Sequence, residues 1–114
     1  MSAPGLQGLR PWIMQRISAV YIALSLFYFA IVLLLADAFS ASAWLAWVAT
    51  PYNNIALGLF LLAVLWHAWI GVRDVVLDYL PNVMARILAL SLVGLVLLGS
   101  ALWGLKALFM VAIK

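Results

Sequence analysis

Residues 55–79 read IALGLFLLAVLWHAWIGVRDVVLDY, and this stretch decides the fold. Its first part, residues 55–72, is apolar except for one ionisable side chain, His67, and contains no proline. A helix needs about 20 mostly apolar residues to cross the hydrocarbon core of a bilayer, where it must satisfy its own backbone hydrogen bonds. We therefore predict a transmembrane helix over residues 55–77, with a histidine deep inside it.

Two further apolar stretches predict two more spans, at approximately 17–36 and 87–105, with an extension of the last one to residue 113 left open. Short polar breaks separate the three stretches, and Pro51 and Pro81 within them disfavour a continuous helix. Neighbouring helices joined by short loops run antiparallel. The chain is thus predicted to be all-α, with residues 1–114 forming a single membrane domain whose three transmembrane helices make an up-down-up bundle.

The composition excludes most other classes of protein. The chain has 114 residues, of which 70% are hydrophobic and 8% charged, whereas a soluble domain is typically about 25% charged. The net charge of +3 is spread along the chain and forms no dense basic stripe, so we expect membrane lipid and no nucleic acid as a partner. With no cysteine, the chain has neither disulfides nor thiolate metal sites.

The first span has some features of a signal peptide, because Ala41-Ser42-Ala43 after it fits an A-x-A cleavage site. The hydrophobic region of a signal peptide is usually about 7 to 15 residues, which is shorter than the stretch 17–36. We expect this stretch to be retained as a transmembrane helix.

The distribution of basic residues predicts the orientation. Arg10 and Arg16 precede the first span, Arg73 and Arg86 lie around the second loop, and the first loop has no lysine or arginine. Because cytoplasmic loops carry the excess of Lys and Arg, the N-terminus is predicted to be cytoplasmic. The tail from Lys106 onward then lies on the opposite side of the membrane.

His67 is the candidate functional residue, because an ionisable group at this depth is costly and usually serves a function. Neutral imidazole binds metals through one ring nitrogen, and Ala63 and Gly71, one turn before and after it, leave space for a planar macrocycle. Two purely structural explanations of these residues stay open. The histidine can instead bond to a neighbouring helix, and small residues are equally expected wherever two membrane helices pack closely.

A six-coordinate b-type haem needs two axial ligands, and this chain has one histidine and no cysteine. The second ligand is therefore expected from another subunit. Haem propionates are anionic, so a cation at the cytoplasmic surface is expected near them, and Arg16 and Arg73 are the candidates. The positive-inside rule alone explains both arginines equally well.

The stretch His67-Ala68-Trp69-Ile70-Gly71, followed by Val76 and by Asp78-Tyr79, carries a resemblance to a known family. Its pattern H-x-x-x-G-x-x-x-x-x-x-D-Y resembles that of the hydrophobic membrane anchor subunit of bacterial succinate dehydrogenase, the D-type subunit of respiratory complex II. Residues 12–19 are similar to the arginine-containing start of the first helix in that family. Three spans in a chain of this length also agree with the architecture of that family.

The resemblance implies roles for particular residues. His67 is expected to be an axial ligand of haem b, shared with a cytochrome b anchor subunit against which the bundle packs, and Arg16 to contact a haem propionate. Tyr79 is expected to hydrogen-bond ubiquinone, with Asp78 beside it in the quinone pocket. On the residues alone, Tyr79 is equally an interfacial aromatic and Asp78 a solvated acid.

The resemblance further implies an anchor without catalytic activity of its own, in the bacterial inner membrane. Its partners are expected to be the cytochrome b, iron–sulfur and flavoprotein subunits of succinate:quinone oxidoreductase. No role transfers to Arg73 and Asp74.

Two alternative functions stay open for a chain of this kind. The first is the anchor subunit of a related fumarate reductase, which can lack haem. The second is a small transporter or a purely structural membrane protein. A proton-coupled transporter is expected to carry an acid inside a span, and the apolar stretches 17–36, 55–72 and 87–105 contain none.

Overall fold

A computed structural model describes residues 4–37 and 39–113 of the chain. Within these residues it contains four helices and no strand. The helices are α1 (Pro4–Leu35), α2 (Ala41–Ala49), α3 (Pro51–Tyr79) and α4 (Val83–Ala112). Three of them, α1, α3 and α4, are long and apolar enough to cross a membrane, which confirms the predicted three-span, all-α fold.

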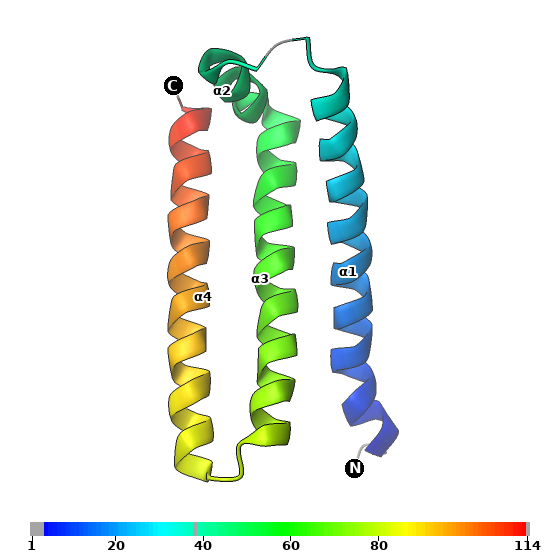
Figure 1. The fold of residues 1–114 in the computed structure, drawn as a ribbon, viewed down its shortest axis with the longest axis vertical. Helices are drawn as coiled ribbons and strands as arrows, with labels where there is room; N and C mark the ends of the chain where they lie inside the picture. The colour runs from blue at the N-terminus through cyan, green and yellow to red at the C-terminus, as the bar shows by residue number, and fades with distance from the viewer. Residues whose placement is uncertain (1–3, 38, 114) are drawn as a thin grey trace.

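The long helices extend beyond the predicted spans, because a helix can continue past the hydrocarbon core into the interface, where water is available. The largest difference is in α1, which begins at Pro4 and runs through Pro11. Proline is favoured in a first turn, where its missing N–H has no helical partner, but inside a helix it removes a hydrogen bond and bends the axis. The N-terminal end of α1 leans away from the rest of the helix (Figure 1).

The short helix α2 was not predicted, since we interpreted its residues as part of a connection. Ser40 caps its N-terminus, and the Ser40 hydroxyl oxygen accepts a hydrogen bond of 3.1 Å from the backbone N–H of Ala43. The sequence does contain a signal for this helix. Ser40 precedes an uninterrupted run of residues without ionisable side chains, and the run ends at Thr50-Pro51. Figure 1 shows α2 lying across one end of the molecule, and it packs against α3 and α4.

The three long helices form one layer with α3 in the middle (Figure 1). Helix α3 packs against α1 on one side and α4 on the other, and no backbone contact joins α1 to α4 among the described residues. The chain direction alternates from helix to helix, as predicted for an up-down-up arrangement. The helix that carries His67 therefore has neighbours from this chain on two sides.

The small interior of the layer is half polar. The buried side chains of the described residues are three apolar ones, Val48, Ile70 and Val76, and three polar ones, Ser18, Ser25 and Asn53. Large apolar side chains cover the outside of all three long helices. Because lipid tails are as apolar as leucine, helices in a membrane associate through close packing and polar contacts instead of apolar burial.

A hydrogen-bond network at the α2 end ties the helices together. The Tyr28 hydroxyl donates to Asn53 Oδ1 at 2.7 Å, and Asn53 Nδ2 donates to the carbonyl of Trp47 at 3.1 Å. Asn54 Nδ2 donates to the carbonyls of Val48 and Leu108. These two neighbouring asparagines thus connect α3 to α1, α2 and α4.

Candidate functional site

A polar stripe on α1 positions this helix against α3. Its members, at spacings of three, four and three residues along an otherwise apolar helix, are Ser18, Tyr21, Ser25 and Tyr28. Residues at such spacings share one face of a helix. The Tyr21 hydroxyl donates to the carbonyl of Ala56 at 3.1 Å, and Tyr28 bonds to Asn53 as described above. These bonds fix the register in which Ser18 lies opposite His67.

Ser18 and His67 meet between α1 and α3. The Ser18 hydroxyl oxygen lies 3.0 Å from His67 Nδ1 and also donates to the carbonyl of Gln15 at 3.0 Å. Ser18 is 7% exposed and His67 is half-buried. Sequence analysis missed Ser18, although its position in the polar stripe of an apolar span was a visible signal. Among the described residues, no group hydrogen-bonds to His67 Nε2.

The small residues beside His67 differ in what they face. A Cβ atom added to Gly71 would lie 3.8 Å from Gln15 Nε2, so this glycine lies against α1 and the helix-packing explanation applies to it. Ala63 lines, together with Ser18, a groove of about 470 Å³ between α1 and α3. The Gln15 side-chain oxygen is buried near Gly71 and has no hydrogen-bond partner among the described residues.

Arg16 precedes Ser18 by two residues, and the two side chains leave α1 about 200° apart around the helix axis. Arg16 is exposed, and its guanidinium lies 5.1 Å from the ring centroid of Trp12. The guanidinium thus lies toward Trp12, outside the contact between α1 and α3. Arg73 is half-buried on α3, six residues beyond His67, and the structure assigns it no ion pair among the described residues.

Asp78 and Tyr79 occupy the last turn of α3, about 17 Å along the helix from His67. Both are exposed, Tyr79 to 78%. The turn that follows them is held by Arg86, whose Nε donates to the carbonyl of Leu80 and whose Nη2 donates to that of Leu77 at 3.0 Å. A basic side chain that satisfies the last carbonyls of a helix acts as a cap, a role that sequence analysis had not assigned to Arg86.

Comparison with known proteins identifies the family. The family described as succinate dehydrogenase/fumarate reductase transmembrane subunit matches residues 7–102. The chain belongs to this family. It is also 30% identical over 103 residues to a succinate dehydrogenase hydrophobic membrane anchor subunit of Coxiella burnetii, with 90% of both chains covered.

The family and this relative confirm the predicted succinate dehydrogenase membrane anchor subunit, and neither match favours the fumarate reductase alternative. Three apolar helices and membership of a transmembrane-subunit family likewise make the chain a multi-pass membrane protein. The roles of His67, Arg16, Asp78 and Tyr79 stay predictions at this point.

The described residues of this anchor subunit offer few groups that could bind a metal. Among the described residues no three His, Cys, Asp or Glu side chains come together, and His67 is the single histidine. One imidazole would hold a haem only if a second chain supplied another ligand, since a haem brings the four nitrogens of its own macrocycle.

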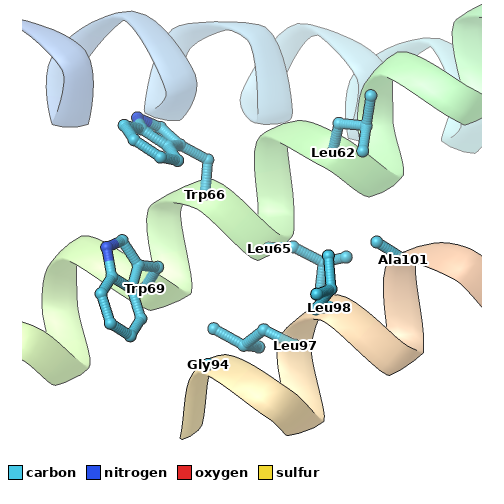
Figure 2. Close-up of a pocket in the computed structure, with 8 residues that line it drawn as sticks. All are labelled: Leu62, Leu65, Trp66, Trp69, Gly94, Leu97, Leu98 and Ala101. Atoms are coloured by element: carbon cyan, nitrogen blue, oxygen red, sulfur yellow. The ribbon is translucent and has the colours of Figure 1, made fainter. Parts of the chain in front are cut away.

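On its other side, α3 of the anchor subunit carries an apolar groove of about 440 Å³ shared with α4 (Figure 2). Figure 2 shows Leu65 and Trp69 of α3 near Gly94 and Leu97 of α4. The described residues that line this groove are apolar or aromatic. His67 instead lies on the α1 side of α3, where Ser18 contacts it.

Proposed function

We propose that this chain is the non-catalytic anchor subunit that completes the haem b and ubiquinone sites of a bacterial succinate dehydrogenase. It holds the flavoprotein and iron–sulfur subunits at the inner membrane, with its N-terminus in the cytoplasm. The observation that carries the proposal is His67: a half-buried imidazole in the middle of a membrane helix, hydrogen-bonded to α1 through Nδ1, with no partner for Nε2 among the described residues.

In this proposal Nε2 of His67 would bind the iron of haem b, and the cytochrome b anchor subunit would supply the second ligand. The haem, when bound, supplies a one-electron carrier between the iron–sulfur subunit and quinone. Arg16, exposed on α1 two residues before Ser18, is the proposed partner of a propionate, since its five N–H donors suit a carboxylate.

Tyr79 and Asp78 are the proposed quinone residues. Reduction of a quinone takes two electrons and two protons, and a phenol can donate a hydrogen bond to the quinone carbonyl. Both side chains are exposed at the predicted cytoplasmic end of α3, where the carboxylate of Asp78 has access to water that can replace a transferred proton. The cap formed by Arg86 keeps this end of the helix ordered.

The haem assignment is tested with the purified four-subunit complex, by a dithionite-reduced minus oxidised spectrum of wild type and His67→Ala. We expect a b-type band in wild type and its loss in the variant, with all four subunits still co-purifying. Ser25→Ala, a buried substitution on the same side of α1, is the matched control and should keep the band. A wild-type complex without a b-type band contradicts the haem assignment.

The quinone assignment is tested with Tyr79→Phe, which removes one hydroxyl from an exposed ring. We expect quinone reduction to fall by about 100-fold or more, the usual contribution of a positioned proton donor, while succinate oxidation with an artificial acceptor is preserved. Tyr52→Phe is the matched control, because Tyr52 is similarly exposed, at 71%, but lies at the opposite end of α3. Equal loss of both activities would indicate misassembly.

A further inference from the structure

We infer that Ser18 is the positioning residue for His67: its hydroxyl selects the imidazole tautomer in which Nδ1 carries the proton and Nε2 carries the lone pair. This inference rests on the proposed role of His67 as a haem ligand. It assigns a function to a residue of α1 that neither the signature around His67 nor the family match singles out.

The serine hydroxyl has a single hydrogen. A hydroxyl donates one hydrogen bond and accepts up to two. The Ser18 oxygen is 3.0 Å from the carbonyl oxygen of Gln15, which can only accept, so this contact is a hydrogen bond when the hydroxyl hydrogen points to Gln15. A serine in a helix commonly donates to a carbonyl three or four residues earlier.

The second contact of the same oxygen then has one direction. Ser18 Oγ is 3.0 Å from His67 Nδ1, and with its hydrogen already used it accepts there. Both contacts are hydrogen bonds at the same time only when Nδ1 carries the proton, and that tautomer leaves Nε2 deprotonated. Ser18 is 7% exposed, so water has little access to replace either partner.

The tautomer of His67 affects how this residue would bind iron. A histidine binds iron through a bare nitrogen, and the hydrogen bond made by its other nitrogen fixes the tautomer and the ring orientation and raises the basicity of the ligand. A more basic ligand favours ferric over ferrous iron. Loss of the acceptor at Ser18 should therefore shift the balance toward ferrous haem and raise its reduction potential.

The experiment uses the purified complex and a redox titration of its b-type band. In Ser18→Ala we expect a higher midpoint potential, corresponding to an approximately threefold to tenfold loss of preference for ferric iron, where tenfold equals about 59 mV for a one-electron couple. Electron paramagnetic resonance of the ferric haem should show changed g-values, because the ring is no longer held. Ser18→Thr retains the hydroxyl and should restore the wild-type potential.

Ser25→Ala is again the matched control, since it removes a buried hydroxyl from the same helix without touching His67, and its potential should equal that of wild type. If Ser18→Ala loses haem while Ser18→Thr and Ser25→Ala keep it, the need for the hydroxyl is equally supported. A wild-type potential in Ser18→Ala, or a shift shared by Ser18→Thr, overturns the inference. A b-type band that survives in His67→Ala instead overturns the proposed function.

Discussion

At the scale of single residues, polar side chains make the packing of the helices specific in this anchor subunit. At 2% exposure, Asn53 is the most deeply buried side chain that the structure describes. It accepts from the Tyr28 hydroxyl and donates to the carbonyl of Trp47, so one amide joins α3 to both α1 and α2. In a membrane, where apolar burial does not distinguish helix from lipid, such bonds determine which helix faces meet.

Replacement of Asn53 by alanine should therefore destabilise the subunit by about 1–2 kcal/mol, from the loss of two interhelical hydrogen bonds. The measurement is reversible unfolding in detergent or the thermal dissociation of the purified complex. Ser100→Ala is the control, because the exposed Ser100 hydroxyl bonds only to Val96 of its own helix, at 2.8 Å, and should give nearly no change. Equal stability of the two variants would contradict a structural role for Asn53.

At the scale of helices, small residues let α3 and α4 approach each other. A Cβ atom on Gly104 would lie 2.3 Å from Leu61 Cδ2, so any side chain there forces Leu61 to move. Gly99, on the same helix, has no atom within 4 Å of such a position. The two glycines therefore have different roles, and Gly104 alone belongs to the contact between the helices.

Gly104→Val should weaken the packing of α3 on α4, whereas Gly99→Val should have little effect. Because valine adds a branched side chain at a position already in contact with Leu61, we expect a destabilisation of about 1–3 kcal/mol. Thermal dissociation of the complex in detergent measures both variants. The same midpoint for the two would show that Leu61 rearranges without cost.

The cap at the end of α3 is a second feature at this scale. Arg86→Ala removes two hydrogen bonds to the carbonyls of Leu77 and Leu80, so the last turn, with Asp78 and Tyr79, should fray. We expect amide hydrogen exchange in this turn to become about tenfold faster, with quinone reduction lowered and the haem band unchanged. Arg10→Ala, an exposed arginine with no hydrogen bond among the described residues, is the control for loss of charge. Unchanged exchange in Arg86→Ala would show that the cap contributes nothing.

At the scale of the whole molecule, the arginines gather at one end. The end that contains Arg10, Arg73 and Arg86 is predicted to face the cytoplasm, whereas the α2 end has no lysine or arginine in residues 36–54 and carries Lys106 of α4. The proposed quinone residues lie at the first of these ends, so under the proposed function the iron–sulfur subunit would dock there.

The absence of cysteine from the sequence allows a direct test of this orientation. Single cysteines are introduced at Val83, which is exposed at the start of α4, and at Ala41, which is exposed at the start of α2. In intact cells, a membrane-impermeant maleimide should label the Ala41→Cys variant, and the Val83→Cys variant only after the cells are opened. The reverse labelling would place the N-terminus outside.

The sequence alone determined the spans, their antiparallel order and the candidate ligand, because a run of about 20 apolar residues has one stable arrangement in a bilayer and a histidine within it stands out. Helix α2 was missed because its nine residues are too few to span the membrane. Its capping serine, Ser40, also resembled part of a polar loop between two spans. Only the tertiary structure decided that Ser18 faces His67, that Gly71 faces Gln15 and that Arg86 caps α3. These contacts depend on the register between helices, which is set by interhelical hydrogen bonds such as that of Tyr28 with Asn53 and not by the period of any one helix.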